Sequence, residues 1–254
     1  MKILRIISLL FIISLAGCSK NDSPVSPDNT AANAGVILPL AVGNEWIYID
    51  SVFTAAGTPE IVDTVKLGIT GKTNIVYQGK SVDVFCWNWY DGNQPDELKW
   101  LCRNEDGGCY SYGLQMANNK FLLQKTQWLK YPVNVGDSWK MLSYAVTDSI
   151  TYAMDTILYS CRSVNEKFKT LKGEMECHVY YSRSDDEGHK YEQFMYFAKN
   201  IGYVGFIYKV DGVINEKYTL LSYSVSGNPS KSAPCIAGKS SRNVSGFPLR
   251  PDRK

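Results

Sequence analysis

Pro39-Leu40-Ala41-Val42-Gly43-Asn44-Glu45-Trp46 decides the fold, because its pattern returns later as Pro132-Val133-Asn134-Val135-Gly136-Asp137-Ser138-Trp139. Both copies read Pro-x-x-Val-Gly-Asn/Asp-x-Trp. A proline start and a glycine next to Asn or Asp favour a tight turn, and the tryptophan then begins a strand. We therefore expect each copy to open one half of the folded region.

Further matches follow the two motifs at nearly constant spacing. The two tryptophans are 93 residues apart, and Asp63-Thr64-Val65 matches Asp155-Thr156-Ile157 at a distance of 92. Gly79 matches Gly173, and the loop from Asp91 to Asp96 matches Arg183 to Gly188. A period this long is typical of two small units and not of a solenoid array. The sequence predicts a duplicated unit of about seven strands, at residues 36–127 and 128–226.

The pattern inside each unit predicts an all-β fold. Apolar residues alternate with polar ones from Trp46 to Phe53 and from Ile61 to Leu67, which is the period of strands. Turn residues interrupt the segments closely, and Asp211-Gly212 between two apolar runs indicates a hairpin. The units are expected to be antiparallel. They pack either as two sandwiches or as one larger sheet or barrel.

The first residues predict export. Met1-Lys2-Ile3-Leu4-Arg5 precedes an apolar run from Ile6 to Leu15, which is too short for an ordinary spanning helix and typical of a signal peptide, residues 1–17. Leu15-Ala16-Gly17-Cys18-Ser19 resembles the lipobox of bacterial lipoproteins. That resemblance implies cleavage before Cys18, diacylglycerol on its sulfur and added acyl chains such as palmitate, so the membrane is the expected partner.

Residues 18–35 contain small and polar side chains and are expected to form a disordered tether. By resemblance to the sorting rule of some Gram-negative lipoproteins, the absence of Asp directly after Cys18 favours the outer membrane. The sequence does not decide whether the folded body faces the periplasm or the cell exterior. Two segments resemble Bacteroidota lipoproteins with a β-rich body: the opening Leu38-Pro39-Leu40-Ala41-Val42-Gly43-Asn44-Glu45-Trp46 and the later Gly202-Tyr203-Val204-Gly205. This resemblance covers residues 36–225 and implies an anchored β-protein, with no catalytic residues to carry over.

The charge is unevenly distributed along the chain. Removal of Lys2 and Arg5 leaves 25 basic and 25 acidic residues, so the mature protein is neutral. The segment 227–254 carries six Lys or Arg and one acid, which leaves the body at net −5. We expect no nucleic-acid binding by the body. The basic tail is expected to be flexible and solvated, or else to touch anionic headgroups or phosphates.

One strand of the first unit suggests a binding surface. From Ser81 to Tyr90, Val82, Val84 and Cys86 share one face, while Phe85, Trp87 and Trp89 share the other. The second face could stack on a sugar ring or an apolar ligand, with Trp100, Tyr110 and Tyr112 nearby if the strands pair in order. The alternative is that this face packs against the other unit.

Six cysteines follow Cys18, and an oxidising compartment permits disulfides. Cys102 and Cys109 bracket a predicted hairpin turn, and Cys161 with Cys177 is the second expected pair. A metal site is not predicted, since no Cys-x-x-Cys occurs and only two histidines are present.

Catalysis is not predicted either. The dense cluster Asp185-Asp186-Glu187-Gly188-His189 lies in a predicted turn, where acids are usually solvated, and a loose calcium site there lacks the usual alternating spacing. No cofactor motif is found.

The leading hypothesis is a non-enzymatic envelope module that binds a glycan or a protein partner. A carrier with an apolar ligand inside a β-shell is the alternative, and a hydrolase is third.

Overall fold

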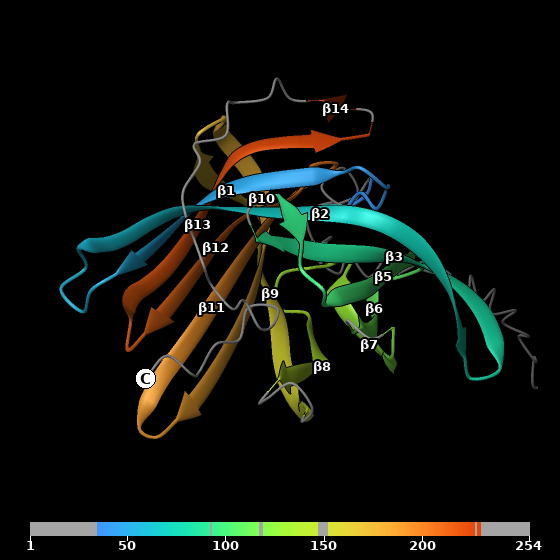
Figure 1. Cartoon of the computed structure of the whole chain (residues 1–254). Helices are drawn as coiled ribbons and strands as arrows, with labels where there is room; N and C mark the ends of the chain where they lie inside the picture. Colours follow the sequence, from blue (N-terminus) through green and yellow to red (C-terminus); the bar gives the residue numbers. More distant parts are fainter. Residues whose placement is uncertain (1–34, 92, 117–118, 147–151, 227, 230–254) are drawn as a thin grey trace, which may run out of the picture.

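A computed structural model gives the fold (Figure 1) and describes residues 35–91, 93–116, 119–146, 152–226 and 228–229. The predicted signal peptide, Cys18, the tether before Gly35 and most of the basic tail lie outside the described residues. Every regular element in the described ranges is a β-strand, which confirms the all-β prediction. The strands are β1 (Glu45–Phe53), β2 (Pro59–Tyr77), β3 (Lys80–Asp91), β4 (Gln94–Pro95), β5 (Lys99–Glu105), β6 (Gly108–Gln115), β7 (Phe121–Lys130), β8 (Ser138–Val146), β9 (Tyr152–Thr170), β10 (Gly173–Asp186), β11 (His189–Ala198), β12 (Gly202–Val210), β13 (Val213–Val225) and β14 (Asn228–Pro229).

All these strands belong to one antiparallel sheet. Two meanders build it: β1, β2, β3, β5, β6 and β7 pair in order, then β8 to β13 do the same, and β1 pairs with β13. The sheet curls until its end strands, β7 and β8, meet. There the indole Nε1 of Trp139 donates to the carbonyl of Trp128 at 3.2 Å. Of the predicted alternatives, one larger, nearly closed, barrel-like sheet is therefore formed.

The two motifs begin the two halves with the same turn. Gly43 and Gly136 both have a φ of 90°, a conformation that favours glycine. The amide of Gly43 donates to the carbonyl of Ile69 at 2.9 Å, and the amide of Gly136 donates to the carbonyl of Cys161 at 2.8 Å. The strands that follow match as well, since β1 and β8 have 9 residues each, and β2 and β9 have 19 each. The motifs thus lie in like settings.

The predicted boundary between the units, at residues 127 and 128, falls inside β7. The strand continues to Lys130 because its alternation continues through the buried Trp128, and the link between the halves follows it. The first half therefore ends just before Pro132, where the second motif begins.

Aromatic rings fill the inner face of the curled sheet. The ring of Trp87 lies 5.1 Å from Trp46 and 5.7 Å from Trp128, and Trp128 lies 6.1 Å from Phe197 of the second half. Tilted and edge-to-face pairs of this kind each add about 0.5–1.5 kcal/mol beyond burial of their area. Two series of ring contacts continue from Phe197. One passes through Tyr180 to Trp139, and the other passes through Tyr203 and Tyr48 to Tyr218.

The outer face of the first half carries a smaller apolar cluster. It comprises Ile75, Val84, Cys86, Leu101 and Tyr112. In the second half Phe168 stacks on Tyr196 at 4.2 Å, and its ring lies so close to Gly205 that a Cβ there would be 2.2 Å away. Only glycine fits at that position without displacing the ring.

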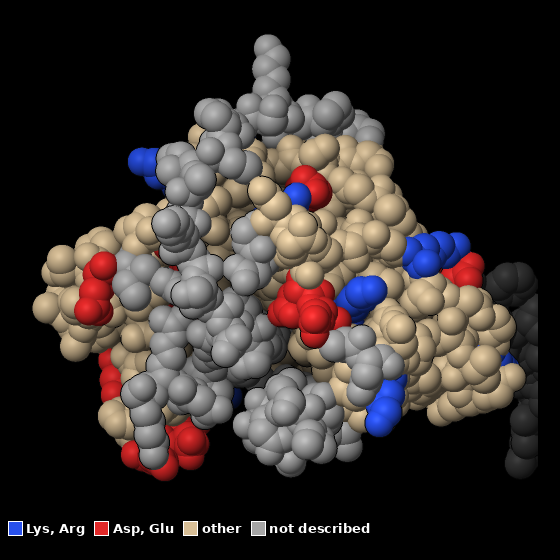
Figure 2. All heavy atoms as spheres, viewed as in Figure 1, with Lys and Arg blue, Asp and Glu red and all other residues tan. Residues whose placement is uncertain are grey.

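The charged side chains are spread over the surface. On the face drawn in Figure 2, Lys, Arg, Asp and Glu form small groups of both signs within a largely uncharged described surface. A search of the described residues for membrane-spanning helices finds none of sufficient length and apolarity.

The buried side chain of Asn44 ties the first motif to the end of the last long strand. Its Nδ2 donates to the carbonyl of Pro39 at 2.7 Å, and its Oδ1 accepts from the amide of Ser226 at 2.9 Å. We expect Asn44→Ala to lower the free energy of unfolding by about 2–3 kcal/mol, because buried partners lose their hydrogen bonds. Urea denaturation measures this change.

Asp137, at the equivalent place in the second motif, provides the matched control. Its carboxylate accepts from the amide of Asn134 at 3.1 Å and pairs with Lys130 at 2.9 Å near the surface. Asp137→Ala is expected to cost less than about 1 kcal/mol. Equal losses in the two variants would contradict the assigned role of Asn44.

Candidate functional site

The structure separates the five aromatic residues that the sequence suggested as one surface. Trp87 is fully buried, Trp89 is 7% exposed, and both lie with Trp100 in the main core. Tyr112 belongs to the smaller cluster on the opposite side of the sheet, and Tyr110 packs against that cluster. The predicted stacking surface is therefore wrong for the tryptophans, because the curl of the sheet turns their face inward. The alternative, that this face packs against the other half, is the arrangement found.

The cysteine predictions are corrected as well. Cys86, Cys102, Cys109, Cys161 and Cys177 are free, and no disulfide joins them within the described ranges of the chain. The two-residue turn at Asp106 and Gly107 places Glu105 opposite Gly108, so Asn104 pairs with Cys109 and Cys102 pairs with Ser111. The two cysteines are therefore diagonal neighbours and not a directly opposed pair. Cys161 pairs with Tyr180 of β10, whereas Cys177 pairs with Glu166.

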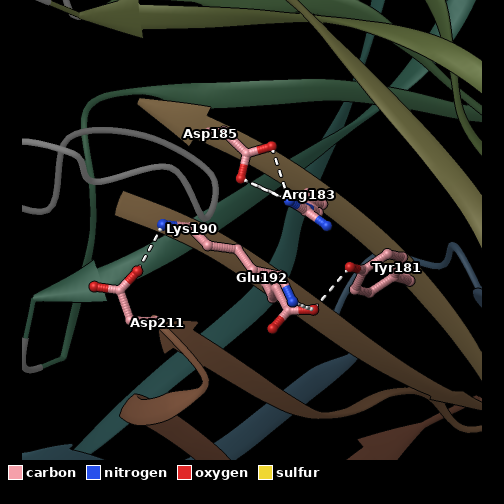
Figure 3. Close-up of polar contacts among 6 residues, drawn as sticks. All are labelled: Tyr181, Arg183, Asp185, Lys190, Glu192 and Asp211. Carbon is pink, nitrogen blue, oxygen red and sulfur yellow. Dashed lines mark hydrogen bonds and ion pairs between the residues drawn. The ribbon is translucent and has the colours of Figure 1, made fainter. Parts of the chain in front are cut away.

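The acidic turn at Asp185 to His189 is held by local ion pairs (Figure 3). Arg183 donates to both carboxylate oxygens of Asp185, at 2.9 and 3.1 Å. The carboxylate of Asp211 accepts from the amide of Lys190 at 2.8 Å and contacts the ring Nδ1 of His189 at 2.7 Å, which raises the pKa of that exposed imidazole. These contacts stabilise the β10–β11 hairpin and link it to the turn between β12 and β13, so the charged cluster has a structural role.

The inner face holds a different set of polar groups that the sequence analysis missed. Asp50 follows Trp46 and Tyr48 on the buried side of β1 and is only 2% exposed. Its cross-strand neighbours are Asp63 on β2 and Tyr218 on β13. Two carboxylates thus oppose each other on adjacent strands, an arrangement that is unfavourable without compensation.

We call this region the acidic–aromatic patch and define it by Asp50, Asp63, Trp89, Glu216 and Tyr218. Glu216 lies two residues before Tyr218 on the same face of β13, and the hydroxyl of Tyr218 donates to it at 3.1 Å. The ring of Trp89 meets the ring of Tyr218 edge to face at 5.6 Å. Asp63, Glu216 and Tyr218 are partly exposed, so the patch runs from the buried core outward.

Electrostatics place the carboxylates close to the tyrosines. Burial raises the pKa of Tyr218 well above its usual value, and the negative charges of Glu216 and Asp50 raise it further. The pKa of Tyr203 is also raised well above its usual value, mainly by burial and then by Glu216, Tyr159 and Asp50. The phenols therefore stay neutral and supply ring faces and hydroxyl groups beside a negative centre.

Trp89 adds a donor to the patch. Its Nε1 is buried and has no hydrogen-bond partner among the described residues, whereas Nε1 of Trp46 donates to the carbonyl of Ile201 at 2.6 Å. An unsatisfied buried N–H is unfavourable by about 1–3 kcal/mol, so a bound acceptor would stabilise it. Carboxylates, ring faces and this N–H are groups of the kind that bind a polar or cationic ligand.

A signal for this patch exists in the sequence. The alternation Trp46, Tyr48, Asp50 places an acid in line with two core aromatics. An acid that continues a buried stripe is a functional candidate, because burial of a charge is unfavourable and therefore rare.

Comparison with known proteins adds little at this point. The chain matches no protein-family model and no curated protein. A solved structure from Bacteroides fragilis NCTC 9343, described as an exported protein with a YmcC-like fold, matches with a TM-score of 0.46 and 14% identity, over 74% of this chain and 99% of that one. Another from Parabacteroides distasonis ATCC 8503, described as a lipoprotein, matches with a TM-score of 0.35 and 11% identity, over 74% of this chain and 98% of that one. Likeness at this level transfers neither a function nor a location.

The two tryptophans offer a test of the patch. Trp89→Phe keeps the ring contact and removes an N–H without a partner, whereas Trp46→Phe breaks a hydrogen bond. We expect Trp46→Phe to lower the free energy of unfolding by about 1–2 kcal/mol more than Trp89→Phe. Guanidinium denaturation of both variants measures the difference. A larger loss for Trp89→Phe would show that its N–H is already satisfied.

Proposed function

We propose that the protein is a lipid-anchored, non-catalytic binding module of the bacterial cell envelope, and that it binds a glycan at the acidic–aromatic patch. The anchor rests on the segment Leu15 to Cys18, which resembles a lipobox and follows a short apolar run. The observation that carries the binding function is the buried N–H of Trp89, which has no hydrogen-bond partner among the described residues, on a ring that contacts Tyr218, the cross-strand neighbour of Asp50.

A glycan fits this chemistry better than a protein partner does. Pyranose rings stack on aromatic faces, and their hydroxyl groups both donate to carboxylates and accept from N–H groups. The patch supplies all three features within one inner face. A protein interface would instead call for a broad exposed surface, and the patch grades into the buried core.

The carrier hypothesis receives less support. A shield for an apolar ligand needs an apolar interior with room, and the middle of this sheet is occupied by rings in mutual contact, from Trp46 through Trp87 and Trp128 to Phe197. The patch at one side of these rings is acidic, which disfavours a hydrocarbon occupant.

Mass spectrometry of the N-terminal peptide tests the anchor. In the mature protein the peptide is expected to begin at Cys18 and to carry acyl chains, since two or more chains make stable attachment possible. Cys18→Ser removes the sulfur, and we expect it to leave the peptide unlipidated and uncleaved. Cys235→Ser serves as the control and should keep the lipid. An unmodified Cys18 in membranes would refute the anchor.

A glycan array probed with the detergent-purified full chain tests the binding function. We expect binding to a subset of glycans, and a loss of at least tenfold in Tyr218→Ala, which removes a ring from the patch. Tyr110→Ala removes a ring from the outer face and should leave binding unchanged. An array without any bound glycan contradicts the function, and a loss confined to Tyr110→Ala places the site on the outer face.

A further inference from the structure

We propose that the acidic–aromatic patch recognises the protonated amino group of an amine-bearing sugar. The inference rests on the proposed glycan-binding function and names the substrate class for the same site. It combines three independent features of the patch: its charge, its ring faces and the donor of Trp89.

The charge of the patch favours a cation. Asp50, Asp63 and Glu216 lie on one face of three adjacent strands, and Asp50 and Asp63 face each other across β1 and β2. On that face the residues next to these acids along β1, β2, β12 and β13 carry no positive charge; they are Tyr48, Val65, Leu67, Phe206, Tyr208 and Leu220. Asp63 and Glu216, which are partly exposed, would attract an ammonium group.

The ring faces favour the same group. Tyr218, the cross-strand neighbour of Asp50, contacts Trp89 at 5.6 Å, Phe206 at 5.3 Å and Tyr48 at 6.2 Å, so aromatic rings cluster next to Asp50. Cations are attracted to aromatic faces by about 0.5–2 kcal/mol, and more strongly where water is excluded. Carboxylate and rings together therefore select a cation attached to a ligand that can enter an apolar surrounding.

The donor of Trp89 narrows the ligand further. Its Nε1–H needs an acceptor, which a simple ammonium ion cannot supply because all its N–H groups donate. A hydroxyl oxygen next to the amine supplies that acceptor, and the C–H face of a pyranose ring packs on Tyr218. A sugar with a free amine brings the cation, the acceptor and the ring in one molecule.

Two oligosaccharides that differ only in acetylation provide the probes: the tetramer of glucosamine and the tetramer of N-acetylglucosamine. Acetylation removes the positive charge and keeps the ring. Binding to the detergent-purified full chain is measured by calorimetry at about pH 5.5, where the free amines of the tetramer are protonated. We expect the amine tetramer to bind at least tenfold more tightly than the acetylated one.

Charge-only variants locate the effect. Asp50→Asn and Glu216→Gln keep shape and hydrogen bonding, and each is expected to weaken the amine tetramer at least fivefold without changing the acetylated one. Asp83→Asn is the control, since Asp83 is an exposed acid paired with Lys72 at 2.8 Å, away from the patch. Glu216 is partly exposed, so Glu216→Gln keeps the test valid if Asp50→Asn fails to fold.

The outcomes separate this inference from the proposed function. Equal binding of both tetramers overturns amine recognition and leaves glycan binding standing. If trilysine binds as tightly as the amine tetramer, the patch recognises charge alone, and the inference of amino-sugar recognition is overturned. If neither tetramer binds while the array detects other glycans, only this inference fails. If the array is empty as well, the proposed function fails with it.

Discussion

The pairing of β1 with β13 is the contact on which the rest of the structure depends. It joins the first strand of one half to the last long strand of the other, so two meanders become one sheet. The turn before β1 secures it, because the side chain of Asn44 bonds to the chain just after β13. Without this joint each half would expose a curved, aromatic inner face. Those two faces bury each other instead, through Trp128 and Phe197.

The repeated turn shows what local chemistry settles. Glycine followed by Asn or Asp requires the same positive φ in both copies, and the same backbone hydrogen bonds result. The alternation after Trp46 likewise predicted strands and their two faces correctly. Each of these properties depends on a few neighbouring residues, which is why they could be inferred from sequence.

Other properties depend on how strands meet. Both faces of β3 carry large apolar side chains, and only the direction of sheet curl decides that Trp87 and Trp89 turn inward. The register of the β5–β6 hairpin places Ser111, and not Cys109, opposite Cys102. The patch at Asp50 needs three strands, with Asp63 beside it from the next strand and Tyr218 from the last long strand of the other half. Periodicity within one strand cannot supply such pairings.

The meeting of β7 and β8 has a mechanical consequence. These end strands touch through single contacts, such as the amide of Leu142 donating to Thr126 Oγ1 at 3.0 Å, and no ladder between them is formed within the described ranges. Individual bonds of this kind can break separately, whereas a ladder resists as a unit. The wall is therefore joined at this place by separate bonds, and the pairing of the hairpins on either side does not depend on them.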